Sequence, residues 1–340
     1  LYGRYLRKLA EADGCKRVEG KIARVELNDE NGDIAALHLD GDRRIEGDMF
    51  VDCTGFRGLL IDGALHAGFE DWSHWLPNDS AIAVQAKHVG LPQPYTQAIA
   101  HDAGWQWRIP LQHRMGAGIV YTSGYLSRDE AYDRLMGSVG EPLIEPFDIK
   151  FKGGVRRRQW YRNCVAVGLS GGFVEPLEAT TVHLIQRAVL RFIRLMPNGR
   201  VSERDAQEFN DQQRLDIEQI RDFVVLHYKA TNRRDSPFWR HVANMPVPDS
   251  LQQKIELFRE TGRVFRKYEE LFAENSWVQV MMGQGIEPQS YHPIADKLRD
   301  DEVERLFQTI RDNIAQTVAT LPEHHAYVAR YCGAEAPKAA

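Results

Sequence analysis

The sequence predicts an α/β protein in which a mostly antiparallel sheet is followed by a C-terminal helical region. Three observations support this fold class. Apolar and polar residues alternate in short segments up to residue 123, an apolar run before two glycines follows at 164–172, and apolar residues recur at helical spacing from Thr180. With 340 residues, 43% of them hydrophobic, the chain can bury a sizeable core and form two or more layers or domains.

Each element is predicted from its local pattern, in chain order. Residues 1–15 have the spacing of an amphipathic helix. Strands are expected at "KIARVEL", "AALHL", "DMFVDCTG", "AIAVQAKHV", "GWQWRIPL" and "GAGIVYTS", because turn residues separate these segments. The run "CVAVGL" is typical of a buried strand. Helices are expected from Thr180 to Pro197 and over residues 203–230, 250–275 and 299–320.

Composition excludes several classes of partner. The net charge is −5, so we expect no nucleic-acid partner. No apolar run approaches the ~20 residues of a membrane span, and the first residues lack a signal-peptide core. The four cysteines are far apart without zinc-like spacing, and the histidines lack ligand spacing too, which predicts reduced thiols, no metal and a cytoplasmic location.

The segment "GLSGGFVEPLEATTVHL", residues 168–184, runs from a glycine turn into a helix. A helix N-terminus offers unpaired N–H groups and a partial positive charge, so it suits an anion. Pro176 and Glu178 also fit a first helical turn on structural grounds alone. Two acids, Glu175 and Glu178, are nevertheless unusual if the only task is to bind phosphate. We therefore expect one of them to be catalytic or buried with a partner.

Three further regions could carry chemistry. "DCTGFRG", residues 52–58, is either a cofactor turn or an ordinary Asp turn. In "GWQWRIPL", Trp105 and Trp107 point to one face of a strand, which is usually sheet packing. "HYKATNRRDSPFW" at 227–239 and "NSWVQVMMGQGIEP" at 275–288 are aromatic and polar, and taken alone they indicate helix packing.

Taken in order, "DCTGFRGLLI", "GWQWRIP", "GLSGGFVEPLEATTVHL", "HYKATNRRDSPFW" and "GQGIEP" resemble the flavin-dependent tryptophan halogenase family. The resemblance covers the chain to about residue 321, and the Trp-X-Trp-X-Ile-Pro signature from Trp105 to Pro110 separates these halogenases from hydroxylases. It implies a flavin-monooxygenase-like, FAD/NAD(P)-binding body with a mostly antiparallel substrate sheet over residues 1–196. Residues 197–340 would form a helical region that caps the substrate.

The resemblance also implies an activity. The protein would be an FADH2-dependent halogenase that installs chloride or bromide on an electron-rich aromatic such as tryptophan or another indole, through a flavin hydroperoxide and hypohalous acid. A separate flavin reductase would supply the reduced FAD. Glu178 matches the family's catalytic glutamate, which orients the halogenating species and accepts the proton lost from the ring.

Further site residues follow from the same resemblance. Backbone groups of Thr180 and Thr181 would hold the halide, in a halide and flavin turn at 168–183. Glu175 would be structural. The residues expected to border the flavin are Val18, Leu169 and Val182, and those of the tunnel and its signature are Trp105, Trp107 and Pro110.

The sequence departs from the family pattern in several places. The glycine-rich dinucleotide motif and the catalytic lysine of the family are not found, so the chain resembles the C-terminal portion of a halogenase and is expected neither to hold FAD tightly nor to halogenate alone. Ala179 replaces the family's serine. Glu270 and Leu271 lie nearest the positions of its substrate-stacking Phe-Trp pair, so indole, peptide-bound tryptophan or a larger phenolic would suit as well as free tryptophan.

Two other functions remain open. One is a flavin-dependent aromatic monooxygenase that hydroxylates its substrate, against which the "GWQWRIP" signature argues. The other is a non-catalytic, truncated flavoprotein.

Overall fold

The computed structural model describes residues 2–334, and these pack into two units with separate hydrophobic cores. Both units are assembled from non-contiguous segments. The predicted division between residues 196 and 197 stays a prediction. The first unit contains the residues up to Gly68 together with Arg156–Gly171 and Ile185–Gln212; the second contains Phe69–Val155, Gly172–Leu184 and the residues from Gln213 onward.

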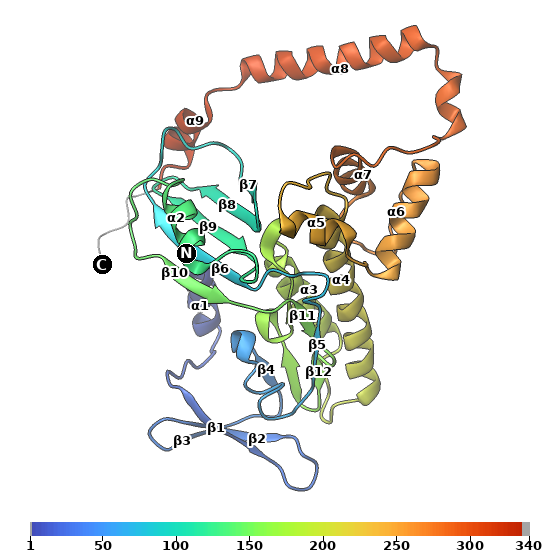
Figure 1. Cartoon of the computed structure of the whole chain (residues 1–340). Helices are drawn as coiled ribbons and strands as arrows, with labels where there is room; N and C mark the ends of the chain where they lie inside the picture. Colours follow the sequence, from blue (N-terminus) through green and yellow to red (C-terminus); the bar gives the residue numbers. More distant parts are fainter. Residues whose placement is uncertain (1, 335–340) are drawn as a thin grey trace. The chain divides into compact units, whose positions relative to one another are not determined.

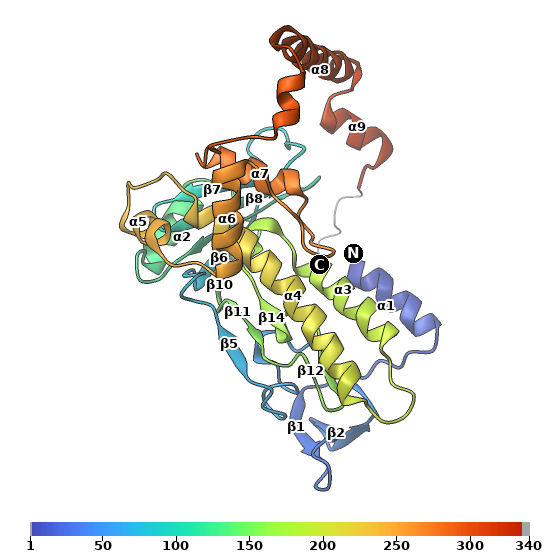
Figure 2. The same ribbon diagram turned by 90° about the vertical axis from the view of Figure 1, so that its right-hand side faces the viewer.

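The first unit contains helix α1 and two small sheets. One sheet is antiparallel in the order β1-β2-β3, and Figure 2 shows β1 and β2 side by side. In the other sheet β13 pairs parallel with β4 and antiparallel with β12. The bounds are α1 Tyr2–Ala12, β1 Ile22–Leu27, β2 Ile34–Leu39, β3 Arg43–Glu46, β4 Phe50–Asp52, η1 Gly55–Arg57, β12 Trp160–Tyr161, β13 Cys164–Ala166 and η2 Gly168–Ser170.

Asp52, at the end of β4, holds the turn that follows this strand. Its Oδ1 accepts the Thr54 N–H at 2.9 Å, and its Oδ2 accepts the N–H groups of Leu60 and Ile61, each at 2.9 Å. The side chain is buried, so both oxygens are used by the chain's own backbone. Asp52 therefore orders the backbone of this turn, and a role of the turn in cofactor binding stays a prediction.

The second unit is built around a five-stranded antiparallel sheet in the order β10-β6-β9-β8-β7 (Figure 1). Trp105 and Trp107 of β8 lie opposite Val120 and Gly118 of β9. Helix α2 begins after Ser127, which forms a capping box with Glu130. The bounds are β6 Ser80–Ala86, β7 Gln97–His101, β8 Gly104–Pro110, β9 Met115–Tyr121, α2 Arg128–Met136 and β10 Phe147–Lys150.

A small sheet and the helices complete the description. Strands β14, β11 and β5 form a three-stranded sheet, and α3 and α4 each have residues in both units. No helix within residues 2–334 combines the length and apolarity needed to cross a membrane. The bounds are β5 Phe69–Asp71, β11 Gly154–Arg156, β14 Gly172–Phe173, η3 Pro176–Glu178, α3 Thr181–Arg194, α4 Glu203–Lys229, α5 Pro237–Asn244, α6 Asp249–Thr261, α7 Glu274–Gly283, η4 Pro293–Lys297, α8 Asp300–Thr320 and α9 His324–Tyr331.

The prediction of one long helix over residues 250–275 is wrong for its second half. Helix α6 ends at Thr261 because Gly262 takes a left-handed conformation, with φ 67°, and donates its N–H to the Phe258 carbonyl. Such a residue ends a helix, and glycine adopts it without strain. The helices predicted over 203–230 and 299–320 are confirmed by α4 and α8.

Candidate active site

The predicted strand, turn and helix are confirmed between β13 and α3, with the turn made of short 3-10 segments and β14. Glu178 ends η3, and Ala179 then takes a left-handed conformation with φ 51° and ψ 40°. This conformation is uncommon for a residue other than glycine. The chain reverses here, and the Thr180 carbonyl accepts the Leu184 N–H at 3.0 Å as α3 begins. Glu178 therefore stands directly before a helix N-terminus.

Glu178 pairs with His227 of α4, which is the main polar contact of this turn. Its Oε1 lies 3.0 Å from His227 Nε2, and the two side chains are 32% and 19% exposed. His227 is held from its other side, since Nδ1 lies 2.8 Å from the Phe223 carbonyl oxygen. The Phe223 ring also packs edge-on against the imidazole, with centroids 5.1 Å apart.

These two contacts fix the orientation of the imidazole. With Nδ1 beside the Phe223 carbonyl oxygen, Nε2 faces the Glu178 carboxylate.

Glu175, three residues before Glu178, has very different surroundings. It is 2% exposed, and its Oε2 accepts hydrogen bonds from Asn78 Nδ2 at 2.8 Å and Trp105 Nε1 at 3.4 Å. Its Oε1 has no hydrogen-bond partner among residues 2–334. Burial raises the pKa of this carboxyl, against the hydrogen bonds from Asn78, Tyr228 and Trp105. The expectation that one of the two acids is buried with a partner is confirmed for Glu175.

Trp105 and Trp107 lie near this network on β8. Trp105 is 5% exposed and contacts Glu175, whereas Trp107 is half-buried against the same core. The two rings have centroids 6.0 Å apart. Trp105 therefore packs in the core and also donates a hydrogen bond to the buried acid.

A cavity of about 420 Å³ lies beside His227. Its walls include Trp239 of α5 and the polar side chains of Asn232 and Gln284. Arg233 also lines it, with the guanidinium 4.9 Å from the Trp239 ring centroid. The cavity offers aromatic and polar contacts next to the residue that pairs with Glu178.

The other predicted site residues lie in several places. Thr180 is buried, and Thr181 begins α3. Val182 is 57% exposed in the first turn of that helix, within the second unit. Val18 is 48% exposed and Leu169 lies in η2, both in the first unit. Pro110, at the end of β8, lines a different cavity from the one beside His227.

Two expectations about other side chains can be compared with the structure. Glu270 is 1% exposed and accepts from Lys254 Nζ at 2.8 Å, so it belongs to the protein's own packing. Leu271 is 38% exposed. Among residues 2–334, no group of three or more His, Cys, Asp or Glu side chains could hold a metal ion.

The chain belongs to the tryptophan halogenase family, because the family model described as tryptophan halogenase matches residues 1–300. A curated relative, the 7-chloro-L-tryptophan 6-halogenase KtzR of Kutzneria sp. (strain 744), is 35% identical over 98% of this chain and 66% of its own length. The tryptophan 6-halogenase SttH of Streptomyces toxytricini is 35% identical over 97% of this chain and 64% of its own. The chain thus spans about two thirds of the length of these relatives.

Solved structures confirm the predicted fold class. The structure is similar to Xcc4156, a flavin-dependent halogenase from Xanthomonas campestris, with a TM-score of 0.96, 50% identity and coverage of 99% of this chain and 68% of that one. It is also similar to BrvH, a flavin-dependent halogenase from Brevundimonas sp. BAL3, with a TM-score of 0.94, 45% identity and coverage of 96% and 67%.

His227 is the site residue that sequence reasoning missed. It stands in the segment "HYKATNRRDSPFW", whose pattern indicated only helix packing, and no spacing relates it to Glu178. The two residues are 49 positions apart, and only the fold brings them together.

Proposed function

We propose that this protein is an FADH2-dependent halogenase that places chloride or bromide on an electron-rich aromatic such as tryptophan or another indole. Family membership supports the class of reaction. The observation that carries the proposal is the contact between Glu178 and His227, because it puts a proton acceptor at a helix start suited to an anion.

The residues of this turn suit the two other components. Backbone N–H groups in the first turn of α3, near Thr180 and Thr181, have no acceptor within the helix, so they could hold a halide. By the family resemblance, Val18, Leu169 and Val182 are the residues proposed to border the flavin. Val18 and Val182 are exposed, and Leu169 lies in η2. Reduced FAD, when bound, would supply two electrons for the reduction of oxygen. The oxidant formed in this way would convert the halide to hypohalous acid.

Glu178 then serves the substitution on the aromatic ring. A carbon–halogen bond forms as the halogen–oxygen bond of hypohalous acid breaks, and the hydroxide released leaves as water. A carbon–hydrogen bond of the ring then breaks, and its proton must pass to a base. Glu178 accepts this proton, and His227, 3.0 Å from its Oε1, holds the carboxylate in position. His227 is a positioning residue in this scheme.

The cavity beside His227 supports an aromatic substrate of modest size. Its volume of about 420 Å³ lies in the range of small-molecule sites, and Trp239 provides an aromatic wall.

A flavin reductase is the expected partner. A cytoplasmic location suits the free thiols of Cys15, Cys53, Cys164 and Cys332.

A product analysis tests this proposal. The protein, expressed from its whole reading frame, is incubated with FAD, NADH, a flavin reductase, oxygen, indole and bromide or chloride. Mass spectrometry is expected to find indole in which one hydrogen is replaced by the halogen supplied. A product that has gained one oxygen would indicate a hydroxylase instead. Flavin oxidation without any modified indole would show that the protein neither halogenates nor hydroxylates this substrate.

A further inference from the structure

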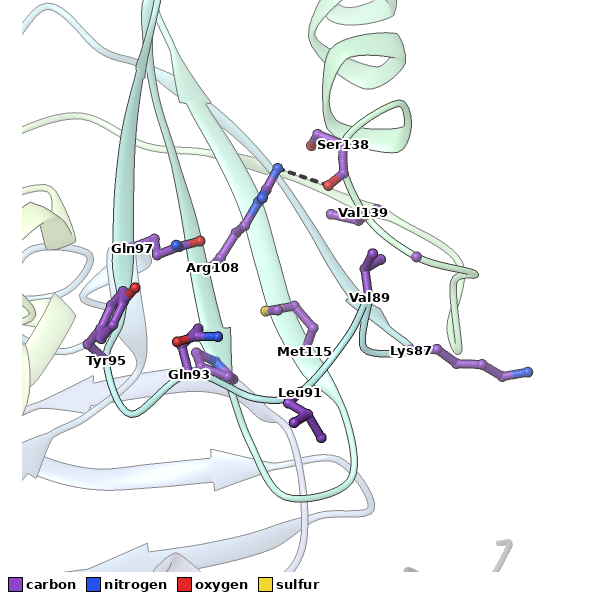
Figure 3. Close-up of a pocket in the computed structure, with 12 residues that line it drawn as sticks. Lys87, Val89, Leu91, Gln93, Tyr95, Gln97, Arg108, Met115, Ser138 and Val139 are labelled. Carbon is purple, nitrogen blue, oxygen red and sulfur yellow. Dashed lines mark hydrogen bonds between the residues drawn. The ribbon is translucent and has the colours of Figure 1, made fainter. Parts of the chain in front are cut away.

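A second cavity, of about 250 Å³, lies in the second unit near the end of β8 (Figure 3). The loop between β6 and β7 supplies one wall, and Met115 of β9 and Val139 after α2 supply others. Side chains alternate between the faces of a strand, so Arg108 points away from the face that carries Trp105 and Trp107. None of its lining residues lines the cavity beside His227. It is therefore separate from the candidate active site.

Arg108 is the main polar group of this cavity. Its Nη2 donates to the Ser138 carbonyl at 2.9 Å, as Figure 3 shows. Its Nε is buried without a hydrogen-bond partner among residues 2–334. Buried N–H groups are rarely left unpaired in proteins. Lys87, the other cation of the cavity, already pairs with Glu141 at 2.6 Å. Arg108 thus offers a charged donor without an acidic partner in the described part of the chain.

The loop between β6 and β7, beside Arg108, exposes large apolar side chains to solvent. Val89 is 76% exposed, Leu91 63% and Tyr95 56%, and all three line the cavity. The loop is anchored rather than free at its start, since Lys87 N–H donates to the Glu141 carbonyl at 2.8 Å. An apolar group bound here would remove this surface from water.

We propose that this cavity is an accessory binding site for a small carboxylate with an apolar ring or branched chain. The carboxylate would accept from the guanidinium of Arg108, which lines the cavity, and the apolar part would lie against Val89, Leu91 and Met115. A guanidinium matches the planar geometry of a carboxylate. The single unpaired cation and the apolar walls favour such a ligand over phosphate, and the volume limits it to about the size of one amino acid.

Calorimetry with two matched probes tests the site. The protein from its whole reading frame is titrated with 3-phenylpropionate and with 3-phenylpropanol, which has the same ring and chain without the charge. We expect the acid to bind and the alcohol to bind at least about tenfold more weakly. Arg108→Gln should raise the Kd of the acid by about tenfold or more, and Leu91→Ser should raise it severalfold.

Control variants locate the ligand. Arg134→Gln also removes one positive charge close to the sheet, but Arg134 pairs with Asp102 outside the cavity, so it should leave the Kd unchanged. Glu178→Gln should do the same, and a changed Kd in that variant, in either direction, would place the ligand at the candidate active site and overturn the proposal. Equal binding of acid and alcohol would also overturn it, as would displacement of the acid by equimolar inorganic phosphate. Leu91 is exposed, so Leu91→Ser keeps the test decisive even if Arg108→Gln fails to fold.

Discussion

Glu175 and Glu178 are three residues apart, yet their carboxylates have opposite surroundings. Glu175 is 2% exposed and bonded by Asn78 and Trp105, whereas the Glu178 side chain is 32% exposed and bonded to His227. The buried acid joins the turn to the sheet of the second unit. The partly exposed acid lies 3.0 Å from Nε2 of His227.

Replacing Glu175 should change how stability depends on pH. Burial raises the pKa of this carboxyl, so the folded protein keeps a proton that the unfolded chain loses above about pH 4.3. Its contribution to stability is complete below that pH and is lost as pH rises through the folded pKa. Relative to wild type, Glu175→Gln should therefore gain stability with rising pH, by at most about 1.4 kcal/mol per pH unit.

Urea unfolding at several pH values between 4 and 9 measures this difference. The free energies of unfolding of the two proteins should diverge above about pH 4.3 and run parallel below it. Curves that stay parallel over the whole range would mean that the carboxyl titrates alike in the folded and unfolded protein.

Replacing His227 should uncouple flavin oxidation from product formation. His227→Gln keeps a polar side chain but removes the imidazole that contacts Glu178, so the carboxylate is held less firmly in position. We expect product per flavin oxidised to fall by about tenfold, less than the loss expected for a catalytic base.

His241→Gln is the matched control for this prediction, because His241 is an exposed histidine on α5. Its coupling ratio should equal that of the wild type. If His227→Gln behaves like the control, the contact with Glu178 has no part in the reaction.

At the scale of single elements, β8 and β9 show how the signature tryptophans are accommodated. Gly118 lies opposite Trp107, and a Cβ at Gly118 would come within 2.1 Å of the Trp107 ring and 2.6 Å of the Ile82 carbonyl oxygen. A Cβ at Gly116, two residues earlier on the same strand, would meet nothing closer than 3.8 Å. The space for Trp107 thus depends on the glycine opposite it.

Gly118→Ala should therefore destabilise the protein by about 1–3 kcal/mol, the usual cost of overpacking a core. Gly116→Ala adds the same methyl group to the same strand and should change stability by under about 0.5 kcal/mol. Urea midpoints of the two variants measure this. Similar losses in both would show that the strand, rather than the ring of Trp107, resists the substitution.

The elements also show what the sequence could predict. Strands β6, β8 and β9 and helix α4 follow the apolar periodicity and were expected. The strands β5 and β7 were not expected, whereas β4 and β13, with three residues each, were, because these two lie in apolar runs. The end of α6 depends on one glycine in a left-handed conformation, which a helical pattern of apolar residues does not reveal.

Across the whole molecule, site features that depend on neighbouring residues could be predicted from the sequence, whereas contacts between distant residues could not. Glu178 could be proposed from its position in a motif before a helix. Its contact with His227 depends on packing between η3 and α4, and that of Glu175 with Asn78 joins residues 97 positions apart. Contacts of this kind are set by the fold, so sequence patterns could name the residues but not pair them.

If Glu178 is the base of the halogenation reaction, removing its charge should stop halogenation without stopping flavin oxidation. Wild type and Glu178→Gln, each expressed from its whole reading frame, are supplied with reduced FAD, oxygen, bromide and indole, and bromoindole per flavin oxidised is measured. The variant keeps the size and hydrogen bonding of the side chain, so flavin oxidation should continue while bromoindole falls by about 10²-fold or more. Equal yields of bromoindole per flavin in the two proteins would contradict the account.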